Sequence, residues 1–147
     1  MPLDEPLPIS VGLRLQNTSE LDARIQEITD PSSPEYREYL TPEEFIELYG
    51  PPQSDYAAVV AWGLEQGLTI VETYDTLIAM IGPVRAINQA LCVTMEYRLR
   101  PDGTEFFAPD RVPSITLDAD ILAISGLENY CVPRSVSFGP PPVEGCY

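Results

Sequence analysis

The chain has 147 residues, of which 23 are acidic and eight are basic, so its formal net charge at pH 7 is −15. This balance excludes the basic face that binding to nucleic acid or to an anionic membrane requires. The sequence contains no histidine, which excludes Ser-His-Asp and Cys-His catalysis and argues against a structural zinc site. An apolar content of 44% is enough for one folded domain with a hydrophobic core.

The N-terminal part of the chain predicts a strand followed by a helix. Apolar and polar residues alternate over residues 7–15, which is typical of a strand with one buried face. Apolar residues then recur at helical spacing over residues 21–28, after the polar residues 17–19 that can cap a helix. Asp30-Pro31 ends this helix.

Residues 30–45 hold a dense set of helix signals. Thr41 is an N-cap candidate, Pro42 suits the first helical position, and Glu44 stands where it can close a capping box. Gly50 is followed by two prolines, which ends a short helix predicted over residues 42–49.

The middle of the chain predicts a longer helix, two strands and a further helix. Ser54 can cap the longer helix, and Gly67 ends it. Its apolar stripe is formed by Tyr56, Val59, Val60 and Leu64. Trp62 lies off this stripe, and the sequence leaves open whether it packs beneath a loop or belongs to a binding surface. The strands are predicted at residues 69–73 and 77–81, and the next helix at residues 84–91.

The last third of the chain predicts a hairpin and a final strand. Strands at residues 94–99 and 104–107 flank Pro101-Asp102-Gly103, a turn sequence. A last apolar run covers residues 121–124. We place the domain at residues 1–129 and a linker or extended, proline-rich tail at residues 130–147.

Without insertions, the order of these elements is β-α-β-β-α-β. This is the ferredoxin-like split β-α-β plan, an α+β fold in which helices cover one face of an antiparallel sheet. The segment at residues 42–49 becomes a helical insertion. The other sheet face is left uncovered by the chain, so it needs a partner or a polar coat.

The remaining motifs are few. Cys92, Cys131 and Cys146 form no CxxC motif. We expect Cys92 to be a small core residue, and whether Cys131 and Cys146 pair in an oxidising compartment is left open. The acidic N-terminus has no apolar run, so we expect no signal peptide, and no segment is long enough to span a membrane. We expect a soluble protein without metal or cofactor, since no metal-spaced set or phosphate-binding loop is present.

The run from Asp30 to Glu44 resembles the DPxSPxYGxYLTxEE segment in the propeptides of sedolisin-type peptidases, the activation domains of kumamolisin-like serine-carboxyl peptidases. Further similar segments follow in the same order: Tyr49-Gly50-Pro51, Val60 to Leu68, Gly82 to Leu91, Tyr97 to Gly103, Pro113 to Ile115, and Ile124 to Asn129. Three positions depart from the family pattern: Arg37 and Cys92 stand where glycine is usual, and Gly63 stands where leucine is common.

The resemblance implies a function that needs no catalytic residue. Such a prodomain is an intramolecular chaperone and inhibitor of its peptidase: its open sheet face packs on the catalytic domain and its tail enters the substrate cleft. The implied interface residues are Tyr74, Tyr97, Phe106 and Phe107. The implied cleft-binding tail is Pro133, Arg134, Ser135, Val136, Ser137 and Phe138. The partner would be a sedolisin-type catalytic domain, from a family that is usually secreted or found in acidic compartments.

The chain itself is not expected to be an enzyme. The family's catalytic Glu-x-x-x-Asp pair and Gly-Thr-Ser serine are both absent from it. Two alternatives stay open: a stand-alone inhibitor or chaperone that acts in trans, and a propeptide fold reused as an enzyme or small-molecule binder. An apolar pocket with a buried acid such as Glu72 or Glu96 would favour the latter. The sequence leaves the cognate peptidase, the oligomeric state and the localisation open.

Overall fold

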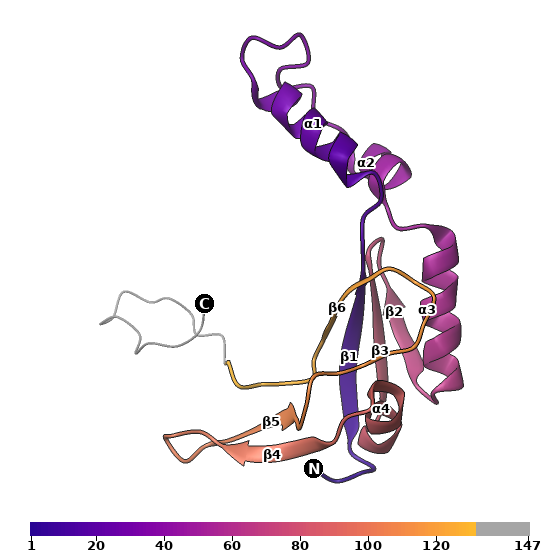
Figure 1. The fold of residues 1–147 in the computed structure, drawn as a ribbon, viewed down its shortest axis with the longest axis vertical. Helices are drawn as coiled ribbons and strands as arrows, with labels where there is room; N and C mark the ends of the chain where they lie inside the picture. Colours follow the sequence, from indigo (N-terminus) through magenta and orange to yellow (C-terminus); the bar gives the residue numbers. More distant parts are fainter. Residues whose placement is uncertain (132–147) are drawn as a thin grey trace.

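The computed structural model describes residues 1–131, which form six strands and four helices within that range. The strands are β1 (Pro6–Leu13), β2 (Thr69–Thr73), β3 (Leu77–Pro83), β4 (Met95–Leu99), β5 (Glu105–Pro109) and β6 (Ile121–Ser125). The helices are α1 (Thr18–Thr29), α2 (Pro42–Tyr49), α3 (Gln53–Glu65) and α4 (Val84–Leu91). The main sheet is antiparallel with the order β2-β3-β1-β6. The predicted ferredoxin-like α+β fold is therefore confirmed (Figure 1).

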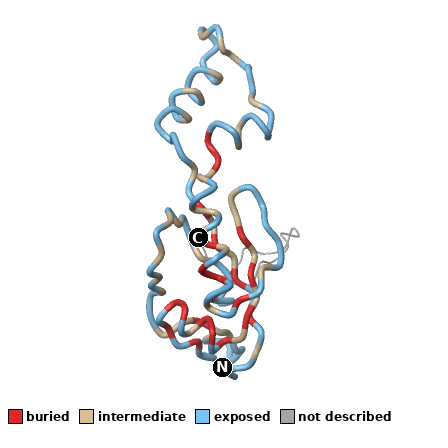
Figure 2. The backbone as a smooth tube through the Cα atoms, turned by 90° about the vertical axis from the view of Figure 1, so that its right-hand side faces the viewer, coloured by how far each residue is buried: buried red, intermediate tan, exposed pale blue. Residues whose placement is uncertain are grey.

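The hydrophobic core lies between one face of this sheet and the helices α3 and α4. The alternation predicted for the first strand is present, because Leu7, Ile9, Val11 and Leu13 are all buried. They pack with buried residues of β3, α3 and α4 in one cluster. The intervening residues of β1 face away from it, so the helices cover a single face of the sheet. Figure 2 shows the buried positions gathered in this lower part of the molecule.

Helix α3 packs largely with the apolar stripe that its sequence predicts, because three of the four predicted residues contact the core, but its last turn differs. Val59 is buried as expected, but Leu64 is 57% exposed and Trp62 is 6% exposed. Trp62 therefore belongs to the core, and the open question about its placement is settled. Gly63 is also buried, and a Cβ at that position would lie 2.7 Å from the sulfur of Met80 on β3. The glycine lets α3 approach the sheet more closely than leucine would allow.

The end of α4 corrects the expectation for Cys92. This residue caps the helix with a φ of 53°, in the left-handed region, and its side chain is exposed instead of buried in the core. Arg37 also has a positive φ, of 65°. Both residues stand where the sequence comparison expected glycine. The backbone thus keeps a conformation that favours glycine, although these residues carry a Cβ.

Helices α1 and α2 form an arm, residues 14–50, that projects from one end of the sheet (Figure 1). The predicted capping box is confirmed: Thr41 accepts a hydrogen bond from the Glu44 amide, and the Glu44 carboxylate accepts one from the Thr41 amide. At the base of the arm the Gln16 amide donates to the Tyr49 carbonyl oxygen at 3.0 Å. No residue of α1 is buried, so the arm adds nothing to the main core.

The predicted hairpin is present as a separate two-stranded sheet, β4-β5, at the other end of the molecule. Asp102 and Gly103 form its turn as the sequence predicts: Asp102 accepts hydrogen bonds from the amide and hydroxyl of Thr104, and Gly103 has a φ of 82°. The hairpin and the arm both extend away from α3 (Figure 1).

Candidate partner-binding surface

The face of the main sheet opposite the helices is lined by small side chains. Ser10 on β1 lies between Ala79 on β3 and Ser125 on β6, and the next outward residue of β1, Gly12, is opposite Ala123. We call these five residues, Ser10, Gly12, Ala79, Ala123 and Ser125, the open sheet face. Each is intermediate or exposed, so this strip of the sheet is accessible.

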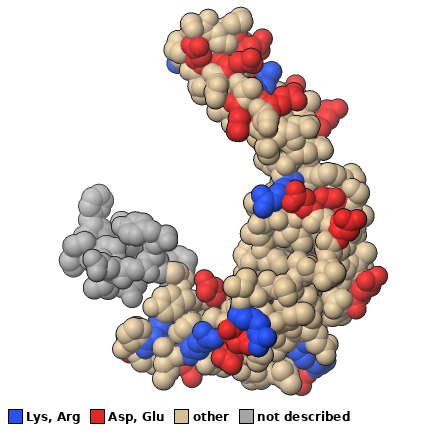
Figure 3. Space-filling view, in the orientation of Figure 1, with Lys and Arg blue, Asp and Glu red and all other residues tan. Residues whose placement is uncertain are grey.

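The open sheet face carries no charge. None of the residues of β1, β3 or β6 is charged, in a chain in which 21% of residues are. On the remaining strand, β2, Glu72 pairs with Ala79 and borders the face. Figure 3 shows the charged side chains concentrated on the arm and near the hairpin, with few over the centre of the molecule. The cores of protein interfaces are depleted in charged residues in the same way. The strip formed by β1, β3 and β6 can therefore bury against another protein without desolvating a charged side chain, whereas Glu72 lies at the β2 edge of the face.

The two candidate tyrosines lie on different parts of the fold. Tyr74, 50% exposed, is next to the β2–β3 turn, where its hydroxyl donates to the Glu72 carboxylate at 2.5 Å. Tyr97, 44% exposed, is on the hairpin, and its hydroxyl donates to Glu5 at 2.9 Å. These hydrogen bonds raise the pKa of each tyrosine. Both tyrosines present a ring to solvent while the hydroxyl is already satisfied.

The two candidate phenylalanines point to opposite faces of the hairpin. Phe107 is directly opposite Tyr97 in the ladder and packs against the main core. Phe106 is opposite Arg98 and contacts the edge of the Tyr130 ring, with 4.9 Å between ring centroids. The structure thus brings Tyr97 and Phe107 together but does not gather all four aromatic residues into one patch.

Arg100 is a functional candidate that the sequence did not reveal. Its Nε donates to the carbonyl oxygen of Tyr130 at 3.0 Å, and its other nitrogens donate to Thr104, Glu105 and Asn129. The guanidinium also lies over the rings of Phe106 and Tyr130, at 5.4 and 5.7 Å from their centroids. No local sequence pattern predicts this arrangement, because the hydrogen-bond partners of Arg100 are up to thirty residues away in the chain.

Asn129 completes this anchor. Its side-chain oxygen accepts a 2.8 Å hydrogen bond from the Phe107 amide. Together, Arg100 and Asn129 fix the chain at residues 129–130 against the hairpin. The predicted cleft-binding residues Pro133 to Phe138 lie outside the described residues. Cys146 does too, so the question of whether it pairs with Cys131 stays open.

The features that a reused catalytic pocket would need are not found in residues 1–131. Glu72 and Glu96 are both exposed, and no charged or polar residue of this part of the chain is buried. The same residues contain no group of three or more acidic or cysteine side chains placed to hold a metal. No helix in the described range is long and apolar enough to cross a membrane.

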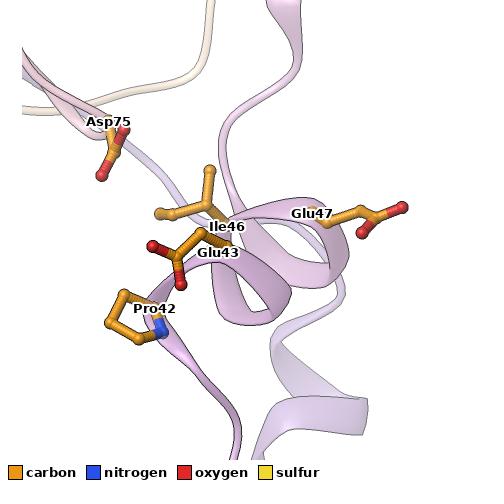
Figure 4. A pocket seen from close by; sticks show the side chains of 5 residues that line it. All are labelled: Pro42, Glu43, Ile46, Glu47 and Asp75. Carbon is orange, nitrogen blue, oxygen red and sulfur yellow. The ribbon is translucent and has the colours of Figure 1, made fainter.

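Two hollows lie on the arm. An apolar groove of about 610 Å³ runs between α1, α2 and the β2–β3 turn. Beside it is a smaller pocket of about 460 Å³, lined by Pro42, Glu43, Ile46, Glu47 and Asp75 (Figure 4). Both are open surface features without a buried acid or base, so they fit a binding role better than a catalytic one.

The described residues thus combine a ferredoxin-like fold, an uncharged strip on the open sheet face and a chain segment anchored at residues 129–130. Comparison with known families identifies the class of domain, because the model described as "Pro-kumamolisin, activation domain" matches residues 1–130. The chain belongs to this family of peptidase activation domains. It resembles xanthomonalisin of Xanthomonas sp. with 33% identity over 138 residues, which is 90% of this chain and 16% of that protein.

Two other relatives show the same partial coverage. Kumamolisin of Bacillus sp. is 29% identical over 135 residues, which is 89% of this chain and 24% of that protein. Human tripeptidyl-peptidase 1 is 38% identical over 64 residues, 44% of this chain and 11% of that protein. The chain thus spans a quarter or less of the length of these relatives and matches only their prodomain part.

Proposed function

We propose that this domain is the chaperone and inhibitor of a sedolisin-type peptidase, which it binds through the open sheet face. Residues 133–138 of the tail would occupy the substrate cleft and hold the enzyme inactive. The proposal applies whether the domain is joined to the peptidase or acts in trans, since the same surface serves both arrangements.

The observation that carries the proposal is the uncharged face in a strongly acidic chain. An accessible antiparallel sheet face normally bears polar or charged residues, because water covers it. The central residues of this face are instead small and uncharged, for example Ser10, Ala79 and Ala123. The family match indicates the kind of partner. A catalytic domain rich in long-range β contacts folds slowly, so a prefolded surface that binds its transition state would accelerate folding.

The direct test is a titration of this chain against a mature sedolisin-type catalytic domain, with xanthomonalisin as the first choice. Binding is measured at pH 7 and at pH 4, peptidase activity at pH 4, and recovery of activity after denaturation with and without the chain. We expect inhibition and assisted refolding, with weaker binding at pH 4 because the carboxylates that surround the uncharged face become protonated. Absence of both effects would overturn the proposal, and equal affinity at the two pH values would remove its pH component.

A matched pair of variants locates the surface. Ala123→Arg places a bulky charge on the open sheet face, whereas Ala57→Arg places the same side chain on the exposed side of α3. We expect the first to weaken binding about tenfold or more and the second to leave it unchanged. Thermal unfolding of both variants verifies that the fold is intact.

A further inference from the structure

We propose that the α1–α2 arm is a second docking surface, and that its occupant is an amphipathic segment of the peptidase's catalytic domain. This segment would carry apolar side chains flanked by lysine or arginine. The inference rests on the proposed function, because it names a further contact with the same partner.

The arm presents an apolar groove that the domain itself does not cover. Helix α1 contributes Leu21, Ile25 and Ile28 to the groove, and α2 with the preceding loop contributes Tyr39, Leu40 and Phe45. Ile25 is 45% exposed and Tyr39 is 72% exposed. Side chains at this spacing normally form the buried face of an amphipathic helix. In the described part of the chain, α2 covers that face only in part, because Leu21, Ile28 and Phe45 are only half-buried.

The isolated arm has little else to hold its helices. Helix α1 has 12 residues and α2 has 8, lengths at which a helix in water is marginal without tertiary packing. None of the arm's groove residues belongs to the main core cluster. A partner that fills the groove would supply the missing packing.

The charge around the groove identifies the chemistry of the occupant. Residues 18–49 hold nine acidic side chains and two arginines, and Figure 3 shows acidic atoms over much of the arm. In Figure 4 the carboxylates of Glu43 and Asp75 lie on the same side of Ile46, whereas Glu47 points away. An apolar groove with acidic borders complements an apolar ridge with basic borders.

Arg24 adds a specific polar contact. It lines the groove, and its terminal nitrogen is 4.0 Å from the Glu35 carboxylate. Its Nε is buried and has no hydrogen-bond partner within residues 1–131. A buried donor without a partner costs stability, so a change in the Arg24 side chain that brings this donor to a backbone carbonyl of a bound segment would be favourable.

The partner is a better occupant than a second copy of this chain. Two copies that met through their arms would bring nine acidic residues against nine others, and such like-charge contacts cost affinity. A protein bound to the open sheet face, in contrast, would lie between the arm and the hairpin, which both project from the sheet away from α3 (Figure 1). The two contact surfaces would then form one continuous interface.

The test uses substitutions at exposed positions, measured against the same mature catalytic domain. Ile25→Asp introduces a charge into the groove, and Leu64→Asp, at an exposed leucine on α3, is the matched control. We expect Ile25→Asp to weaken binding about tenfold and Leu64→Asp to leave it unchanged. If Ile25→Asp binds like the wild type while Ala123→Arg does not, the arm inference is overturned and the proposed function stands. If the wild type does not bind, both are overturned.

A photo-crosslinking residue at Tyr39 provides a second measurement that does not depend on the stability of the Ile25 variant. We expect crosslinks to a segment of the catalytic domain that contains apolar and basic residues, and none from the same residue at position 64. Crosslinks only to a second copy of the chain, or to an acidic segment, would contradict the proposed occupant.

Discussion

Arg100 contacts both the backbone and the ring of Tyr130. Its Nε donates a 3.0 Å hydrogen bond to the Tyr130 carbonyl oxygen, and its guanidinium lies 5.7 Å from the centroid of the Tyr130 ring. One side chain in the hairpin thus fixes the point from which the rest of the chain continues. If the residues beyond 131 enter the cleft of a peptidase, Arg100 sets where they start.

Arg100→Ala is expected to free residues 129–130 without unfolding the main sheet. The variant loses four hydrogen bonds and two ring contacts at the edge of the domain. Amide hydrogen exchange at Phe107 and Asn129 should accelerate by about tenfold or more, while exchange in β1 and β3 stays unchanged. Arg98→Ala removes a charge from the same hairpin and is the control. Unaltered exchange at Asn129 would show that Arg100 is not the anchor.

Glycine at positions 37 and 92 is expected to stabilise the domain. Arg37 and Cys92 have φ values of 65° and 53°, a conformation that costs most residues about 1 kcal/mol relative to glycine. Arg37→Gly and Cys92→Gly should each raise the free energy of unfolding by roughly 0.5–1 kcal/mol, because relief of strain exceeds the entropy that glycine loses on folding. Urea denaturation measures both. Cys92→Ala keeps the strain, so it should not stabilise, and equal gains from glycine and alanine would refute the explanation.

Gly63→Ala is expected to destabilise the domain by about 1 kcal/mol, although alanine favours helices. The new methyl group would lie 2.7 Å from the Met80 sulfur, and such overpacking costs roughly 1–3 kcal/mol against a gain of about 1 kcal/mol in helix propensity. In a Met80→Ala background the space is free, so the same substitution should become stabilising. Ala61→Gly, at an exposed position on α3, gives the propensity contribution alone. A loss that persists in the Met80→Ala background would argue against contact with Met80.

Acid should weaken the hairpin through Asp110. Hydrogen bonds from Arg111 and from the Thr94 amide lower the pKa of this carboxyl below its ordinary value of 3.8. The group binds protons more weakly in the folded state, so its contribution is present above pH 3.8 and is lost as the pH falls through the lower folded-state pKa. Asp110→Asn should reduce the pH dependence of stability below about pH 5. Thermal unfolding across this pH range measures the effect, and Asp118→Asn is the control. If Asp110→Asn leaves the pH dependence of stability unchanged, Asp110 does not contribute to it.

Local signals in the sequence predict much of the fold. The alternation of β1, the capping box at Thr41 and the hairpin turn at Asp102 each depend on residues close together in the chain, so the sequence determines them directly. For α3 the sequence predicts three of the residues that contact the core, but neither the exposure of Leu64 nor the burial of Gly63, which carries no hydrophobic signal. Its role depends on Met80 across the interface.

The sequence predicts less of the candidate surface than of the fold. The pattern of α1 indicates an apolar face but not which element covers it, so nothing in the sequence separated the arm from the sheet. Arg100 could not be identified because its partners are distant in sequence. The small residues of the open sheet face became visible only when the register placed Ser10 beside Ala79 and Ser125.

The strand order has a consequence for synthesis on the ribosome. β1 is made first, yet its partner on one side is β6, with Leu13 opposite Ile121. At roughly 5–20 residues per second, translation leaves this edge of β1 unpaired for about 5–20 s. Pro6 and Pro8 lie in β1 and donate no backbone hydrogen bonds, so they limit pairing with other nascent chains during that interval. The domain is completed only when its last strand emerges, shortly before the tail that follows it.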